Sequence, residues 1–186
     1  METQNDSSVM VLVQAGDSAQ LAILFERYNG PLFRYLFHLT RDRQLSEDLV
    51  QDVFFRVLKY ARTYDPNLSF SVWLYGMARN AYFDSLRKRK SEVTSVDLNE
   101  VRSTEAMPEE LMSRKQDAAD LQRALNKLPE DKREVLLLNR FHNLRYEEIA
   151  RILKCEAGTV RVRAYRALRE LRERFCELRG ERLYDA

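Results

Sequence analysis

Cysteine, histidine, glycine and proline are all scarce in this chain of 186 residues. Two cysteines, Cys155 and Cys176, cannot build a disulfide framework, so we expect a reducing compartment. With two histidines and no close Cys/His spacing, the sequence predicts no metal site, and nothing in it points to a cofactor. Five glycines, four prolines and the lack of strand-like alternation favour a helical protein.

Long apolar runs are missing as well. The apolar stretch Phe70–Ala78 is far shorter than the roughly 20 residues that span a bilayer. The run Val9–Val13 follows two acidic residues and no basic one, which is unlike a secretory signal. We therefore expect a cytoplasmic protein without membrane insertion.

Signatures of catalysis are also lacking. The carboxylate pairs Glu147-Glu148 and Asp48/Asp52 fall on solvated helix faces, with no histidine or nucleophile placed beside them. The chain has no glycine-rich phosphate loop. The sequence therefore predicts a protein that is not an enzyme.

What the chain does contain is a series of amphipathic segments in two groups. Apolar residues at three- and four-residue spacing predict helices from a cap at residue 17 or 18 to 39, from 46 to 61 and from 69 to 88, then at about 115–127, 130–141, 146–153 and 157–175. Residues 91–113 carry six acidic side chains against Arg102 and show weak periodicity. We predict an all-α fold of two small helical domains, residues 1–90 and 115–180, joined by a flexible acidic linker, residues 91–114.

Helix starts in the first group are marked by polar side chains. Asp17 or Ser18 can cap the first helix, and Ser46 can cap the next, because a side-chain oxygen there accepts an unpaired backbone N–H. Gly30-Pro31 interrupts the first helix. Because proline removes a donor and clashes with the preceding turn, we expect a kink there.

The strongest motif is a predicted helix-turn-helix at residues 146–160. Its two short helices must pack closely, and Ala150 supplies the small residue that this requires. A small core would be closed by Ile149, Leu153, Cys155 and Val160. Lys154 stands where many such motifs have glycine, so we expect a left-handed backbone there at a cost of about 1 kcal/mol.

The second helix of this motif is rich in arginine. Residues 157–175 carry six arginines against two glutamates, and arginine forks suit guanine edges and phosphates. The side chains predicted to contact duplex DNA are Thr159, Arg161, Val162, Tyr165 and Arg166. The alternative is an amphipathic helix with an ordinary solvated arginine face.

The helix predicted at 69–88 combines aromatic and basic side chains. Tyr75 and Arg79 lie opposite its apolar face, Trp73 and Asn80 lie on a flank, and Arg87 opens a terminal basic cluster. Bases stack on aromatic rings while cations follow phosphates, so this pattern favours binding of single-stranded nucleic acid. The alternative is a helix buried on two sides, whose terminal cations complement the helix dipole.

The preceding helix carries a polar face with one large apolar residue. Asp48, Gln51 and Asp52 surround Phe55 opposite the core stripe. An exposed phenylalanine among polar side chains indicates a protein-docking patch, although single exposed apolar residues are also common on ordinary surfaces.

Taken together, these segments resemble the extracytoplasmic-function (ECF) sigma factors, the small two-domain members of the bacterial sigma-70 family. The resemblance rests on LFERY (24–28), SEDLVQDVF (46–54), FSVWLYGMARN (70–80), LP (128–129), YEEIA (146–150) and GTVRVR (158–163). These motifs stand in the family's order over nearly the whole chain. The resemblance implies sigma regions 2 and 4 at residues 1–90 and 115–180.

This resemblance also implies a function and partners. Such a protein binds the RNA polymerase core through its β′ clamp helices and β flap and directs initiation at specific promoters, often in a stress response. The clamp-facing residues would be Asp48, Gln51, Asp52 and Phe55. An anti-sigma factor is a further implied partner. In the family the linker threads through the cleft that nascent RNA later occupies; the alternative is a solvated tether.

Promoter contacts follow from the same resemblance. The loop Tyr64–Ser69 would capture a flipped base of the −10 element, and the arginine-rich helix would read the −35 element. Implied −10 contacts are Tyr64, Asn67, Ser69, Trp73, Tyr75, Arg79, Asn80 and Arg87. Gly76 and Met77 replace the melting tryptophan pair of housekeeping relatives, which implies weaker and stricter melting that depends on Trp73 and on base capture. A rival interpretation is a conventional helix-turn-helix regulator with an N-terminal sensor domain, which leaves the aromatic-basic helix unexplained.

Overall fold

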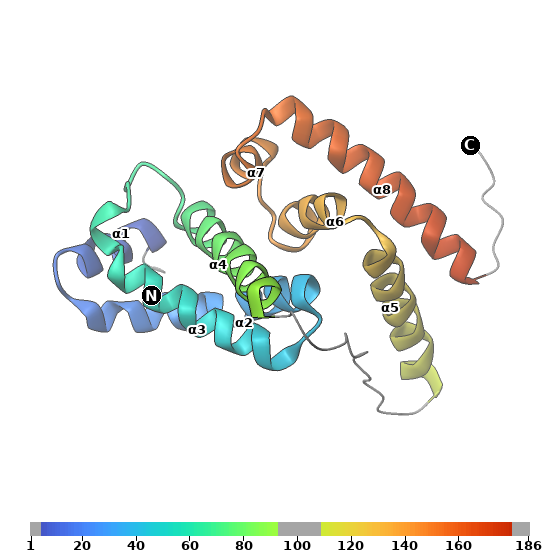
Figure 1. The fold of residues 1–186 in the computed structure, drawn as a ribbon, viewed down its shortest axis with the longest axis horizontal. Helices are drawn as coiled ribbons and strands as arrows, with labels where there is room; N and C mark the ends of the chain where they lie inside the picture. The colour runs from blue at the N-terminus through green and yellow to red at the C-terminus, as the bar shows by residue number, and fades with distance from the viewer. Residues whose placement is uncertain (1–4, 93–108, 180–186) are drawn as a thin grey trace. The chain divides into compact units, whose positions relative to one another are not determined.

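The structure is a computed structural model that describes residues 5–92 and 109–179, with side chains at 5–89 and 117–179 (Figure 1). Every regular element in these stretches is helical. Two compact units divide the chain, one around the helices before residue 99 and the other around those after residue 100. The predicted all-α fold of two helical domains is confirmed, while the exact domain boundaries stay predictions.

The first unit is a bundle of four α-helices with two short 3₁₀ turns. Its elements are α1 (Asp6–Gln14), η1 (Ser18–Gln20), α2 (Leu21–Thr40), α3 (Arg43–Lys59), η2 (Ala61–Thr63) and α4 (Phe70–Glu92). Helices α2, α3 and α4 pack against one another, and α1 lies against α2, α4 and η2. Fully buried side chains include Met10, Leu24, Leu36, Val53 and Leu74. Each such burial contributes about 1.5–3 kcal/mol to folding.

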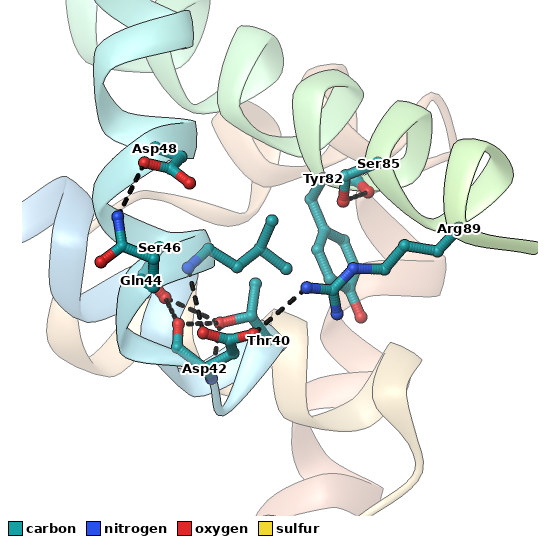
Figure 2. Close-up of polar contacts among 9 residues, drawn as sticks. Thr40, Asp42, Gln44, Ser46, Asp48, Tyr82, Ser85 and Arg89 are labelled. Atoms are coloured by element: carbon teal, nitrogen blue, oxygen red, sulfur yellow. Dashed lines mark hydrogen bonds and ion pairs between the residues drawn. The ribbon is translucent and has the colours of Figure 1, made fainter. Parts of the chain in front are cut away.

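Both predicted N-caps of this unit are wrong. The side chain of Asp17 makes no capping bond, because the 3₁₀ turn η1 precedes α2. Helix α3 begins one turn before the prediction, since the Asp42 carboxylate accepts the Leu45 N–H at 3.0 Å. Ser46 is instead buried inside the helix, where its hydroxyl donates to the Asp42 carbonyl at 2.6 Å (Figure 2). Helix α2 continues through Pro31 as a single element.

The second unit contains four α-helices and one π-helical turn. These elements are α5 (Glu109–Lys127), α6 (Glu130–Leu136), η3 (Leu137–Phe141), α7 (Tyr146–Leu153) and α8 (Ala157–Arg179). A core cluster of Leu125, Leu128, Leu136 and Ala167, with Leu171 beside it, joins α5, α6 and α8. Lys132 of α6 and Glu170 of α8 form an ion pair of 2.6 Å, which also joins these two helices.

The predicted linker is shorter in the structure than in the sequence interpretation. Helix α4 extends to Glu92, and α5 begins at Glu109 rather than at about residue 115. Pro108 therefore stands just before the first residue of α5, where proline is well tolerated. Most of the predicted linker, residues 93–108, lies outside the described residues.

The predicted helix-turn-helix is present as α7 and α8. Lys154 in the turn has φ 53°, which confirms the left-handed backbone predicted there. The Cys155 N–H donates to the Ala150 carbonyl at 3.0 Å and closes the turn. Ala150, Ile149 and Val160 are buried as predicted, whereas Leu153 and Cys155 of the predicted small core are only half-buried. At the start of α7, the Glu148 carboxylate accepts the Arg145 N–H at 2.8 Å, so this side chain caps a helix.

Candidate nucleic-acid and polymerase interfaces

The first turns of α8 separate the core from an exposed face. Val160, Ala164 and Ala167 point inward and are buried. The five predicted duplex contacts, Thr159, Arg161, Val162, Tyr165 and Arg166, are all exposed, with Tyr165 at 69%. A groove of about 500 Å³ runs between Thr159 and Arg166 of this face and Lys132 of α6. The structure therefore brings the predicted residues together on one surface.

Arginines of α8 differ in whether the protein itself neutralises them. Arg163 pairs with Asp131 at 3.5 Å, and Arg169 pairs with Glu173 at 3.6 Å. Arg161 and Arg166 form no ion pair within the part of the chain that the structure describes. Their guanidinium forks are free to bind an external acceptor such as a phosphate or a guanine edge.

Tyr75 of α4 lies in the core, so its predicted contact with DNA is wrong. It is 2% exposed, and its ring packs edge-on against Tyr35 of α2 with 5.3 Å between centroids. Burial raises the pKa of the Tyr75 hydroxyl well above its ordinary value. Tyr82, seven residues further along the same face of α4, is buried as well. Helix α4 packs against both α2 and α3, so the alternative of a helix buried on two sides holds for these rings.

Tyr64 is also buried, so a base contact from its ring is likewise wrong. Its hydroxyl donates to the Leu68 carbonyl at 2.7 Å, across the loop that it opens. Its ring centroid lies 5.2 Å from that of Trp73 and 6.1 Å from that of Phe70. The side chain that was predicted to touch DNA instead holds the two ends of the loop together.

The remainder of this loop forms a tight turn, in which Leu68 is half-buried and the other residues are exposed. The Leu68 N–H donates to the Asp65 carbonyl at 2.9 Å, and Pro66 occupies the second position, where its fixed φ favours the turn. Asn67 donates both its backbone N–H and its side-chain amide to the Asp65 carboxylate, each at 2.9 Å. The Asn67 side-chain oxygen takes no part in these bonds. Ser69 is exposed and shares a hydrogen bond of 2.7 Å with Ser71.

Further along α4, a small hollow of about 400 Å³ is formed by cationic and apolar side chains. Its lining consists of Arg79, Asn80, Phe83, Leu86 and Arg87. The Arg79 guanidinium lies over the Phe83 ring, 4.6 Å from its centroid. Arg87 donates to the Asp84 carboxylate at 2.5 Å. Phe83 and Leu86 were not among the predicted contacts, although the four-residue spacing of Arg79 and Phe83 indicated the pair.

The predicted polymerase face lies on α3. Phe55 is 65% exposed, and Asp48 and Gln51 beside it are exposed too. Asp52 pairs with Arg56 at 2.9 Å, and Arg56 also reaches Asp84 of α4 at 2.9 Å. The Arg56 hydrogen bond holds the pKa of the Asp84 carboxyl below its ordinary value. This face therefore has an exposed phenylalanine at its centre, and one of its carboxylates, that of Asp52, is already paired with Arg56.

The basic end of α4 is partly used to join helices. Figure 2 shows Arg89 reaching the Asp42 carboxylate at the start of α3, at 3.1 Å. The Leu45 N–H and then Arg89 hold the pKa of Asp42 below its ordinary value. Arg89 therefore complements a neighbouring helix start rather than standing free for phosphate.

Sequence reasoning missed the contacts that α1 makes with the Tyr64–Ser69 loop. The Gln14 amide donates to the carbonyls of Ala61 and Tyr64, at 2.9 and 2.8 Å. The Ser7 hydroxyl lies 2.9 Å from the Tyr64 hydroxyl. These partners are 47 to 57 residues apart in the chain, and isolated polar side chains in a short helix carry no signal of such pairing.

Within the described stretches, no cluster of three or more His, Cys, Asp or Glu side chains is placed to hold a metal ion. None of the described helices is both long and apolar enough to cross a membrane.

Comparison with protein families matches both units. Residues 24–92 match Sigma-70 region 2, and residues 118–171 match Sigma-70 region 4. YlaC of Bacillus subtilis (strain 168), an RNA polymerase sigma factor, is 31% identical over 161 residues, covering 85% of this chain and 93% of the relative. The ECF sigma factor SigX of the same strain is 28% identical over 169 residues, covering 88% and 87%.

Solved structures share the fold. CnrH, determined in complex with the cytosolic domain of CnrY, has a TM-score of 0.69 at 21% identity and covers 90% of this chain and 95% of its own. The sigma factor RpoE of Bartonella quintana, determined with the anti-sigma factor NepR, has a TM-score of 0.62 at 24% identity and covers 89% and 92%. Because the first unit matches Sigma-70 region 2, the rival interpretation, a conventional regulator with an N-terminal sensor domain, is not favoured. The chain belongs to the sigma-70 family and is an ECF-type sigma factor, a subunit that directs RNA polymerase to promoters.

Proposed function

We propose that this sigma factor reads the −35 element with α8 and the −10 element with α4 and the Tyr64–Ser69 loop, while α3 binds the polymerase core. The observation that carries the proposal is the exposed face of α8, on which Arg161 and Arg166 stand beside Tyr165 without an ion-pair partner among the described residues. Such forks are suited to base edges of duplex DNA.

For the −10 element, the proposed contacts are those that remain after the buried Tyr64 and Tyr75 are removed. Trp73 and Arg79 are half-buried, and the others are exposed. Asn67 offers a free amide oxygen on a rigid turn, which suits the edge of an unpaired base. Arg79 over Phe83 combines a cation with a ring, as single-stranded nucleic acid requires. Ser69, Asn80 and Arg87 complete this surface, and Trp73 takes the main part in melting.

For the polymerase, the proposed anchor is Phe55 with Asp48, Gln51 and Asp52 around it. A solvated aromatic residue encircled by polar groups has the composition of an interface hot spot. The partner surface would be the β′ clamp helices, with the β flap meeting region 4. Because the structurally similar sigma factor RpoE of Bartonella quintana was determined with an anti-sigma factor, an anti-sigma factor is a further proposed partner. The protein would act without catalysis of its own, in the cytoplasm beside the polymerase.

Reconstitution with polymerase core tests this function directly. Core, the sigma factor and a randomised promoter library should give transcripts from a narrow set of −10 and −35 sequences, and neither protein alone should. Phe55→Ala combined with Asp52→Arg should lower core affinity by about 3 kcal/mol or more while helicity stays unchanged. The control is Val11→Ala, which truncates an exposed apolar side chain on a different helix, α1.

The opposite outcome is equally clear. Tight, sequence-specific binding of duplex DNA by the sigma factor alone, as a symmetric dimer and with no response to core, would contradict the proposal. Loss of helicity in the double variant would show that the α3 face is structural.

A further inference from the structure

Hydrogen bonds near both ends of helix α1 attach it to Tyr64, the first residue of the Tyr64–Ser69 loop. Near its C-terminus, Gln14 donates one amide to two carbonyls, those of Ala61 and Tyr64, at 2.9 and 2.8 Å. Near its N-terminus, the Ser7 hydroxyl lies 2.9 Å from the Tyr64 hydroxyl. Tyr64 is thus held at its backbone and at its side chain by the same short helix.

The helix that makes these contacts is itself anchored. Asp6 accepts from Arg27 at 2.6 Å and from the Tyr28 hydroxyl at 2.5 Å, which pins the start of α1 to α2. Val9, Met10 and Val13 of α1 itself are buried. These contacts fasten α1 to the bundle. The polar contacts from α1 therefore fix the position of Tyr64, where the loop begins.

The loop passes this position on with little freedom. The Tyr64 hydroxyl reaches forward to the Leu68 carbonyl, so the residues between them form a closed ring. Inside that ring, the turn from Asp65 to Leu68 and the two bonds between Asn67 and Asp65 fix where the Asn67 oxygen lies. A displacement of Tyr64 would therefore move Asn67 with it.

We propose that α1 is a positioning element for −10 recognition, in which Gln14 and Ser7 set the loop geometry and thereby the base preference of the sigma factor. This inference rests on the proposed role of the Tyr64–Ser69 loop. Neither side chain touches DNA in this scheme; both act through Tyr64. The competing explanation is that the contacts only stabilise the first unit.

The test is a competition among promoters by reconstituted holoenzyme, with −10 and −35 preferences read separately. Gln14→Met keeps the shape of the side chain but removes both donors, and should reduce discrimination at the captured −10 base about tenfold. Ser7→Ala, which leaves the bond from Tyr64 to Leu68 in place, should reduce it about threefold. Preference at −35 should stay unchanged in both. Gln20→Met is the control, because that amide donates to Asp17, away from the loop.

Two comparisons decide the outcome. If Gln14→Met and Ser7→Ala lower only the unfolding temperature and leave the −10 preference intact, α1 is structural and the inference is wrong. Asn67→Ala separates this from failure of the proposed function. A −10 shift with Asn67→Ala and none with the α1 variants overturns the inference alone, whereas no shift in any of them overturns the role of the loop.

Discussion

Helices α4 and α8 have the same length, 23 residues, and each carries a mixture of aromatic and basic side chains. In the structure they present that mixture differently. The tyrosines of α4 are buried, and its Arg87 and Arg89 pair with Asp84 and Asp42. Helix α8 exposes Tyr165 and leaves Arg161 and Arg166 without an ion pair inside the described parts of the chain.

The difference follows from where each helix packs. Helix α4 contacts both α2 and α3, so two of its faces are internal. Of its cations, Arg89 pairs with Asp42 at the start of α3, and Arg87 pairs with Asp84 of α4 itself. Helix α8 packs on α5 and α6 with one face and keeps the opposite face in solvent. An aromatic-basic composition therefore indicates a nucleic-acid surface only when the neighbouring helices leave one whole face of the helix in solvent.

The largest expected contrast is between the two tyrosines. Tyr75→Ala should lower the unfolding free energy of the first unit by about 3–5 kcal/mol, because it empties a buried site. Tyr165→Ala should change the unfolding free energy by less than about 0.5 kcal/mol yet weaken binding to the −35 site. Urea unfolding and DNA-binding titrations measure both. Similar losses of unfolding free energy in the two variants would contradict the contrast between a buried Tyr75 and an exposed Tyr165.

Arginines along α8 provide the next test. Arg166→Ala should lower affinity for the correct −35 site by about 1–3 kcal/mol and relax the base preference there. Arg172, further along the helix, should contribute only a uniform phosphate contact, so Arg172→Ala should reduce the salt slope of binding by about one. Titrations at several salt concentrations against matched and mismatched sites separate these effects. Equal, sequence-independent losses would make Arg166 a phosphate clamp.

The segments that precede the two helices also differ. Hydrogen bonds close the loop before α4, whereas the turn before α8 places Lys154 in the left-handed region. Lys154→Gly should therefore raise the unfolding free energy of the second unit by about 0.5–1 kcal/mol. Asn143→Gly is the control: Asn143 has φ 54°, and asparagine tolerates that region better, so the gain should be smaller. Thermal unfolding would show no gain at Lys154 if the turn were unstrained.

The smallest expected effect concerns the ion pairs of α4. The Arg56 hydrogen bond lowers the pKa of Asp84 below its ordinary value of 3.8, so Asp84 stabilises the fold above that pH. This stabilisation should disappear as the pH falls through the lowered pKa. Asp84→Asn should therefore cost less than about 1 kcal/mol near neutral pH, since the pair is partly solvated, and nothing in strong acid. Urea unfolding across pH would show a constant difference if the pair contributed nothing.

Much of this architecture follows from the sequence. Periodicity places α7 and α8 correctly at their starts, and the position of Lys154 in the turn predicts its backbone. The exposed face of α8 is predictable because a helix with one apolar stripe must turn its other side to solvent. The exposed position of Phe55 among polar side chains on α3 is predictable for the same reason.

What the sequence does not predict depends on contacts between distant segments. Whether Tyr75 faces solvent depends on whether α2 covers that face of α4, and no local sequence pattern reports which faces of a helix its neighbours cover. The cap at Asp42 competes with an equally suitable Ser46, and tertiary packing decides between them by burying the serine. The bonds from Gln14 span about 50 residues, so their partners emerge only from the fold.

The self-contained nature of the first unit has a consequence during synthesis. Within the described residues, the ion pairs that fasten its helices together, such as Asp6 with Arg27 and Arg89 with Asp42, join residues that precede residue 90. This half of the chain can therefore complete its bundle on the ribosome before α8 has been translated, a delay of several seconds at about 5–20 residues per second. A nascent chain would then display Phe55 before it carries any means of reading a −35 element.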